Sequence, residues 1–205
     1  MLEKVDYARL AERYIRELVS DFVSNPFNFF SESDVKCRLF NMMFQNSEIG
    51  RLKKTIDGKR IYPLHSEVTY FNHEGRLLYH VDLSAVEPEE TDVYSNPQAE
   101  GIRFSKGYSA PECLFAIELK LNKRNKKEKM LVIWEKDMKK LNDILSRNPS
   151  LTCFSMLLDK KNRISDEHEL TNLAASYPRI RIIYANAHGE NFFMNFESHG
   201  TLMKA

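Results

Sequence analysis

Near the middle of the chain, Glu118 and Lys120 follow an apolar run at 114–117, with only Leu119 between them. The apolar run is typical of a buried strand. Because a strand alternates its side chains between two faces, Glu118 and Lys120 should project on the same side, about 7 Å apart. Two charges at the end of a buried strand are unfavourable unless they have partners or a metal ion. The pattern therefore predicts either a metal-dependent active site or a half-exposed strand end with a same-face ion pair.

The Glu-x-Lys triplet alone does not decide between these interpretations. With 19 Glu and 17 Lys among 205 residues, chance supplies roughly 1.6 such triplets. The strands and helices around the triplet are needed to decide whether it belongs to an active site or is a chance match.

A second acidic residue, Asp82, lies in the middle of another predicted strand. The segments 64–71 and 77–86 are short and rich in β-branched and aromatic residues, and 72–75 between them reads as a hairpin loop. Asp is disfavoured in strands. Asp82 is therefore either a site residue beside Glu118 on an adjacent strand or a buried, hydrogen-bonded structural acid.

The remaining elements complete an α/β pattern. The apolar spacing predicts helices at 4–23, from Ser31 onward, at 131–147 and at 167–176, and further strands at 151–158 and 180–185. This order predicts a central mixed β-sheet flanked by helices, whose first strands form an antiparallel meander. We expect a single domain over 1–205, with an N-terminal helical extension at 1–30 and a Gly- and Pro-containing insertion loop at 87–113.

Two converging carboxylates with a nearby lysine suit metal-dependent phosphodiester chemistry. Mg²⁺, or Mn²⁺ in its place, would be held by Asp82 and Glu118, with the backbone carbonyl of Leu119 as a further oxygen ligand. Lys120 would orient the attacking water or stabilise developing charge. Glu32, in a Ser-x-x-Asp segment typical of a helix start, could hold a metal-bound water or a second ion. The alternative for Glu32 is a first-turn acid that is favourable to the helix dipole.

These residues, in this order, resemble the PD-(D/E)XK nuclease superfamily, also called restriction-endonuclease-like. Glu32 lies on an early helix, Asp82 in a strand and Glu118-x-Lys120 in the next strand, and a helix and a strand follow. The resemblance implies a restriction-endonuclease-like fold, two acids that bind Mg²⁺ and a lysine that assists hydrolysis of a nucleic-acid phosphodiester. DNA is the favoured substrate.

Two features depart from the pattern of this family, which the chain resembles over roughly 31–158. Val81 stands where the family motif has Pro, a common substitution. The segment 87–113 separates the Asp82 strand from the Glu118 strand, so the pairing of these two strands is itself a prediction.

A basic stretch begins at the candidate catalytic lysine. Residues 120–129 carry six basic residues and one acid, which would suit contact with a phosphate backbone. The candidate nucleic-acid-binding residues are Lys123, Arg124, Lys126 and Lys127. The alternative is a solvated loop. No aromatic residue interleaves this stretch, so the stretch itself offers no stacking surface for single strands.

Other charged residues could join the predicted site. Glu67 shares a strand face with His65 and either approaches the site or lies on the surface. Lys139 and Lys140, on the helix expected at 131–147, face either the cleft or solvent. No histidine pair has the H-x₃-H spacing of a zinc site.

Composition frames these expectations. With 42% hydrophobic and 29% charged residues, the chain reads as a folded soluble protein. It has no apolar stretch near 18 residues, so we expect no membrane contact, and the N-terminus shows no secretory signal. Three widely spaced cysteines without a C-x-x-C favour reduced thiols and a cytoplasmic, intracellular protein. A net charge of +1 requires any nucleic-acid contact to come from a local patch.

Two further readings remain open. A nuclease-like fold could bind nucleic acid or a protein partner without cleaving, and a purely structural protein would have no site at all. If the protein cuts both strands of a duplex, two active sites are commonly needed, which would favour a homodimer.

Overall fold

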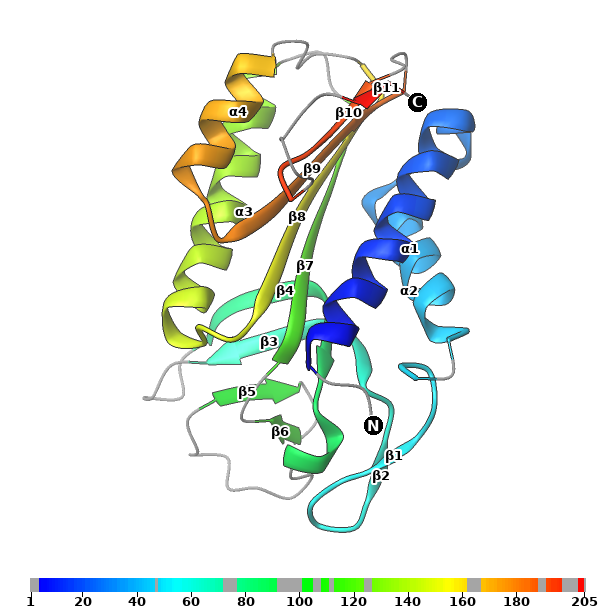
Figure 1. Ribbon diagram of the computed structural model, residues 1–205, viewed down its shortest axis with the longest axis vertical. Coiled ribbons are helices and arrows are strands. Elements are labelled where there is room, and N and C mark those ends of the chain that lie inside the picture. Colours follow the sequence, from blue (N-terminus) through cyan, green and yellow to red (C-terminus); the bar gives the residue numbers. More distant parts are fainter. Residues whose placement is uncertain are drawn as a thin grey trace.

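The computed structural model describes residues 4–46, 48–71, 77–91, 101–104, 108–110, 113–123, 127–161, 167–187, 191–196 and 203–204. The helices in these ranges are α1 (Lys4–Ser24), α2 (Glu32–Phe44), α3 (Lys127–Arg147) and α4 (Glu167–Ser176), with short 3₁₀ helices η1 (Pro26–Asn28) and η2 (Pro88–Glu90). Helices α1 and α2 lie on one side of the long strands, and α3 and α4 lie on the other (Figure 1). The predicted α/β class is therefore confirmed.

The described strands form one large sheet and a small hairpin. They are β1 (Lys53–Lys54), β2 (Arg60–Ile61), β3 (Leu64–Phe71), β4 (Leu77–Val86), β5 (Gly101–Phe104), β6 (Tyr108–Ala110), β7 (Cys113–Asn122), β8 (Thr152–Asp159), β9 (Ile180–Asn186), β10 (Asn191–Met194) and β11 (Met203–Lys204). Strands β1 and β2 pair with each other, and the other nine follow the order β11-β10-β9-β8-β7-β4-β3-β5-β6.

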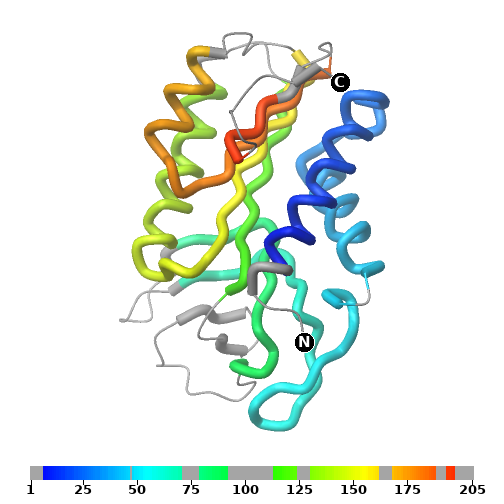
Figure 2. Tube along the Cα trace, viewed as in Figure 1, coloured from blue at the N-terminus to red at the C-terminus, as the bar shows by residue number. Residues whose placement is uncertain are grey.

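The large sheet is mixed, as predicted. Strand β4 pairs antiparallel with both β3 and β7, which makes the expected meander. Strand β7 pairs in parallel with β8, and β8 pairs in parallel with β9. Figure 2 shows these three parallel segments side by side. Helices α3 and α4 make the two crossovers, because parallel neighbours need a long connection.

The helices form where the sequence pattern predicts them. Ser31 caps α2 by accepting a hydrogen bond from the Asp34 N–H, and the Asp34 side chain accepts one from the Ser31 N–H, so the predicted capping box is present. In α1, the apolar residues at helical spacing are Leu10, Tyr14, Leu18 and Phe22, of which Leu18 and Phe22 are fully buried and Leu10 and Tyr14 partly buried. In α3, the apolar residues at helical spacing are all buried: Trp134, Met138, Leu141 and Leu145.

Two hydrophobic cores lie on opposite faces of the sheet. The core on the α1 side includes Phe22, Leu39 and Ile117, and the core on the α3 side includes Trp134 and Leu141. We call them the α1-side core and the α3-side core. Each fully buried side chain of this size contributes roughly 1.5–3 kcal/mol relative to exposure. Since α1 packs on the sheet, the helix of the N-terminal extension is one of its covering layers.

The segment predicted as an insertion loop, 87–113, contains strands where no strand was expected. Strand β5 pairs antiparallel with the end of β3, and β6 pairs with β5, so this hairpin extends the sheet edge. The two strands are only four and three residues long, and Gly and Pro around them obscure the alternating pattern. Backbone pairing to an existing edge, rather than apolar patterning, accounts for them. The loop predicted at 72–75 lies outside the described residues.

Two further expectations concern membranes and thiols. Within the described residues, no helix combines the length and the apolar character needed to cross a bilayer. Cys113 and Cys153 are buried, Cys37 is exposed, and all three are free thiols, as expected.

Candidate active site between strands β4 and β7

The predicted site lies where β4 and β7 separate. The two strands pair antiparallel over four residue pairs, the last of which is Leu83 with Ile117. The same register carried one step further would set Asp82 opposite Glu118, so the predicted adjacency of their strands is confirmed. On its other edge, β7 stays paired with β8 as far as Asn122. The β4-facing edge of β7 is therefore open from Glu118 onward.

Around Asp82, the side chains of β4 no longer alternate regularly between the two faces of the sheet. Val81 packs in the α3-side core, whereas Leu83 packs in the α1-side core, although residues two apart in a strand should share a face. On β3, Glu67 has a φ of 54°, a left-handed conformation that is unfavourable for a residue with a Cβ by roughly 1–2 kcal/mol. Backbone strain of this kind clusters at functional sites.

Two of the predicted site carboxylates take the place of the missing strand partner. The N–H of Leu119 donates to Asp82 Oδ2 at 2.9 Å, and the N–H of Leu121 donates to Glu32 Oε2 at 3.3 Å. Asp82 from β4 and Glu32 from α2 therefore meet the β7 edge on either side of Lys120. Because the N–H and C=O of a strand residue point to the same side, the Leu119 carbonyl faces the same opening.

Glu118 is the most deeply buried acid of the site, with 3% of its surface exposed. Its carboxylate forms an ion pair with Lys140 of α3, whose Nζ also donates to the His80 carbonyl at 2.7 Å. The pKa of Glu118 is raised to about 7, because burial, together with the nearby Asp82 and Asp137, disfavours the carboxylate by more than Lys140 favours it. Glu118 therefore changes its protonation state near neutral pH.

Lys120 lies between two carboxylates. Its Nζ is 3.4 Å from Asp137 Oδ2 and 3.7 Å from Glu32 Oε2. The Asp137 contact is an ion pair by distance only, because this buried oxygen has no hydrogen-bond partner of good geometry among the described residues. Burial lowers the pKa of Lys120, but the surrounding carboxylates, Asp137 foremost, outweigh it, and the pKa is raised. Lys120 is therefore a cation and a hydrogen-bond donor rather than a base.

Glu118 and Lys120 share a strand face, as predicted. Both side chains meet α3, Glu118 through Lys140 and Lys120 through Asp137. The α3-facing side of β7 is therefore charged at the point where the apolar run ends.

Glu67 also reaches the site, through a lysine. Lys36 Nζ forms an ion pair with Glu67 and lies 3.9 Å from Asp82 Oδ1. The Glu67 side chain is more than half exposed, so it stands at the rim. Lys36 thus links β3 and β4 to α2.

Together these side chains form what we call the acidic–lysine cluster. Its members are Glu32, Lys36, Glu67, Asp82, Glu118, Lys120, Asp137 and Lys140. With all of them ionised, five acids and three lysines leave a formal charge of −2, which one divalent cation would balance.

The cluster offers a metal ion few protein ligands. Among the described residues, no three His, Cys, Asp or Glu side chains are grouped so as to hold a metal ion. The residues that could hold a metal are those predicted from the sequence, Asp82, Glu118 and the Leu119 carbonyl, with water as the remaining ligands. Mg²⁺ is usually held in this way, by one or two carboxylates while it keeps several waters.

Two members of the cluster, Lys36 and Asp137, were not considered from the sequence, and Lys140 was considered with its direction left open between the cleft and solvent. Lys36 lies four residues after Glu32, one helical turn away on the same face of α2, and this spacing is a signal that could have found it. Asp137 and Lys140 are three apart on α3 and face the sheet, whereas Lys139 pairs with Glu135 along the helix surface. A charge on a buried helix face becomes recognisable only once the face is known.

The predicted basic stretch is described only in part. Lys123, which directly follows β7, is exposed. Arg124 and Lys126 lie outside the described residues, as does the side chain of Lys127. Their role in nucleic-acid binding stays a prediction.

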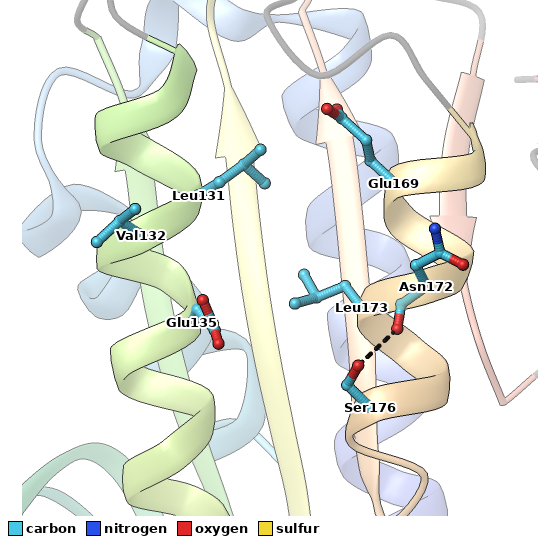
Figure 3. A pocket seen from close by; sticks show the side chains of 7 residues that line it. All are labelled: Leu131, Val132, Glu135, Glu169, Asn172, Leu173 and Ser176. Carbon is cyan, nitrogen blue, oxygen red and sulfur yellow. Dashed lines mark hydrogen bonds between the residues drawn. The ribbon is translucent and has the colours of Figure 1, made fainter.

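A groove between α3 and α4 lies apart from the cluster (Figure 3). It is lined by Leu131, Val132, Glu135, Glu169, Asn172, Leu173 and Ser176. It shares no residue with the acidic–lysine cluster and mixes apolar with polar groups, so it gives no support to a catalytic role.

Comparisons with protein-family models, with curated proteins and with solved structures find no match for this chain.

Proposed function

We propose that this protein is a metal-dependent nuclease that hydrolyses nucleic-acid phosphodiester bonds, with DNA the favoured substrate, on a restriction-endonuclease-like fold. The order of elements supports the proposal. Helix α2 carries Glu32, β4 carries Asp82, β7 carries Glu118 and Lys120, and α3 and β8 follow. This is the order on which the resemblance to PD-(D/E)XK nucleases rests.

One contact carries the proposal: Asp82 Oδ2 accepts a hydrogen bond from the N–H of Leu119, the residue between Glu118 and Lys120. Asp82 and the Glu-x-Lys triplet are 36 residues apart along the chain, as counted from Asp82 to Glu118. Chance placement of an Asp and a Glu-x-Lys triplet would not bring them into contact at the parting of two strands. A structural acid would explain the hydrogen bond, but it would not explain why Glu32 and Lys120 gather at the same edge.

The chemistry follows from the roles that the cluster supports. Mg²⁺ bound by Asp82, Glu118 and the Leu119 carbonyl would polarise the phosphodiester and acidify a bound water. Lys120, kept protonated by Asp137 and Glu32, would stabilise negative charge that develops on the phosphate. Glu118 must lose its proton to bind a cation, so metal affinity should rise as the pH passes 7.

The test is a cleavage assay on end-labelled linear, nicked, branched and single-stranded DNA with Mg²⁺ or Mn²⁺. Asp82→Asn keeps an acceptor for the Leu119 N–H but removes the charge, so it should fold and lose about 10²-fold or more of the activity. Lys120→Ala should lose a similar factor. Glu48→Ala and Lys136→Ala change an exposed acid and an exposed lysine and are the controls. Cutting that continues unchanged in Asp82→Asn and Lys120→Ala would refute the proposal.

A second candidate function, a binding module that does not cleave, has one observation in its favour. Within the described residues both candidate metal ligands already have a lysine nearby, since Lys140 pairs with Glu118 and Lys36 lies 3.9 Å from Asp82. These lysines supply positive charge where a metal ion would otherwise supply it. This candidate predicts binding of nucleic acid or a protein without Mg²⁺. Such binding should weaken when Lys123 and its basic neighbours are neutralised, and Asp82→Asn should leave it intact.

A further inference from the structure

Two exposed phenylalanines lie just before α2, the helix that carries Glu32 of the acidic–lysine cluster. Phe27 is 79% and Phe30 is 74% exposed, the highest values among the large hydrophobic side chains described. Isolated surface hydrophobics are ordinary. These two differ because they share a cation: Lys160 Nζ lies 5.8 Å from the Phe27 ring centroid and 5.7 Å from the Phe30 centroid.

The segment that carries the rings is firmly held. Between them, Phe29 is buried and packs edge-to-face on Phe22 of α1, with ring centroids 5.6 Å apart. The N–H of Phe30 donates to Asp34 Oδ2 at 2.8 Å, in the cap of α2. The rings are therefore presented by an anchored backbone, which reduces the ordering entropy that binding must overcome.

The rings lie in a positively charged setting. Lys160 follows the end of β8, and the charges of Lys123 and Lys161 act on it, which places three lysines in one neighbourhood; the Asp34 carboxylate also acts on Lys160, so three lysines stand against one acid. Lys123 comes three residues after Lys120, and Phe30 comes two residues before Glu32. Since Glu32 Oε2 is 3.7 Å from Lys120 Nζ, Phe30 lies two residues before a side chain that contacts the proposed catalytic lysine.

Aromatic faces together with lysines match the chemistry of unpaired nucleotides. Bases stack on aromatic rings, and lysines follow the phosphates, in proteins that bind single strands without sequence preference. In a duplex the bases are already stacked inside the helix and cannot reach the rings. The sequence offered no such surface, because the basic stretch contains no aromatic residue, but the fold supplies the rings from another part of the chain.

We propose that Phe27, Phe30 and Lys160, with Lys123 and Lys161, bind a single-stranded segment of the nucleic-acid substrate and lead it to the acidic–lysine cluster. This inference deepens the proposed function and rests on it for the role of the bound strand. The substrate would then carry an unpaired end or branch.

Binding can be tested without cleavage, in EDTA, by fluorescence anisotropy with labelled dT20 and with a blunt 20-base-pair duplex. Wild type should bind dT20 more tightly than the duplex. Phe27→Ala and Phe30→Ala should each weaken dT20 binding about fivefold or more, and the change for the duplex should be smaller. Lys160→Gln should weaken binding and reduce its salt dependence. Ile56→Ala, at an exposed residue in the β1–β2 turn beyond the other end of α2, is the control and should bind as wild type does.

A second measurement reports stacking directly. Phe30→Trp should retain dT20 binding and show quenched tryptophan emission when dT20 is added, whereas the buried Trp134 of wild type should show no such change. Wild-type affinity for dT20 in both alanine variants, or equal losses for dT20 and duplex, would overturn the inference. If dT20 binding depends on the two rings but the protein cleaves no DNA, only the nuclease proposal is refuted. The failure of the nuclease proposal can therefore be distinguished from the failure of the single-strand binding proposal.

Discussion

The buried Glu118 predicts a specific dependence of stability on pH. Its pKa is about 7 in the folded protein against an ordinary 4.5, because burial disfavours the carboxylate. The folded state therefore holds this proton more tightly than the unfolded chain does. The contribution to stability is full below pH 4.5 and is lost as the pH rises to 7, and it stays constant above about pH 8.

The size of the effect follows from the two pKa values. A pKa difference of about 2.5, at roughly 1.36 kcal/mol for each unit, corresponds to about 3 kcal/mol between pH 4.5 and pH 8. Glu118→Gln has no proton to lose and imitates the neutral acid. The stability of wild type relative to Glu118→Gln should therefore fall by about 3 kcal/mol across this range, since the carboxylates that do not interact with Glu118 titrate alike in both proteins.

The assay is urea unfolding at pH values from 4.5 to 8.5 in EDTA, followed by far-UV circular dichroism and by the single tryptophan. Glu48→Gln, at an exposed position, should give a profile parallel to wild type. Parallel profiles for wild type and Glu118→Gln would refute the reasoning, because the ionised carboxylate would then be as well accommodated in the fold as in water.

Two substitutions away from the chemistry test the framework that holds the site. Asp34→Ala removes the acceptor for the N–H groups of Phe30 and Ser31, so urea unfolding should show a loss of about 1 kcal/mol, and an unchanged midpoint would contradict the capping role. Trp134→Phe removes indole volume and the Nε1 donor to the buried Ser155 hydroxyl, which are 2.8 Å apart. We expect thermal unfolding to show a loss of about 2 kcal/mol, and a stability equal to wild type would mean that this core tolerates the gap.

Local pattern was sufficient for most of the elements. The strands expected at 64–71 and 77–86 have those bounds as β3 and β4, because β-branched and aromatic residues dominate them and polar residues flank them. Ser31 and Asp34 predicted the start of α2 correctly, because a capping box depends only on residues three apart. Strands β5 and β6 were not predicted, since β5 is stabilised by pairing with the edge of β3, which is distant in the sequence.

Some residues of the candidate site could likewise be recognised from the sequence, whereas others could be recognised only in the fold. Asp82, Glu118 and Lys120 could be chosen from the sequence because a charge inside or directly after an apolar strand is unusual wherever it occurs. Lys140 and Asp137 are ordinary helix charges until α3 is packed against β7. A helix has several polar positions, and only the packing decides which of them are turned toward the sheet.

The sequence by itself determined the order of helices and strands, the antiparallel meander and the candidate site acids Glu32, Asp82 and Glu118. Helix and strand propensity, capping and side-chain alternation act over a few neighbouring residues and can therefore be read locally. Only the tertiary structure decided that β4 and β7 part at Asp82, that Asp82 and Glu32 bind the unpaired edge of β7, and that Phe27 and Phe30 share Lys160. These features depend on contacts between residues that are distant in the chain. Long-range packing sets such contacts, and no local pattern encodes them.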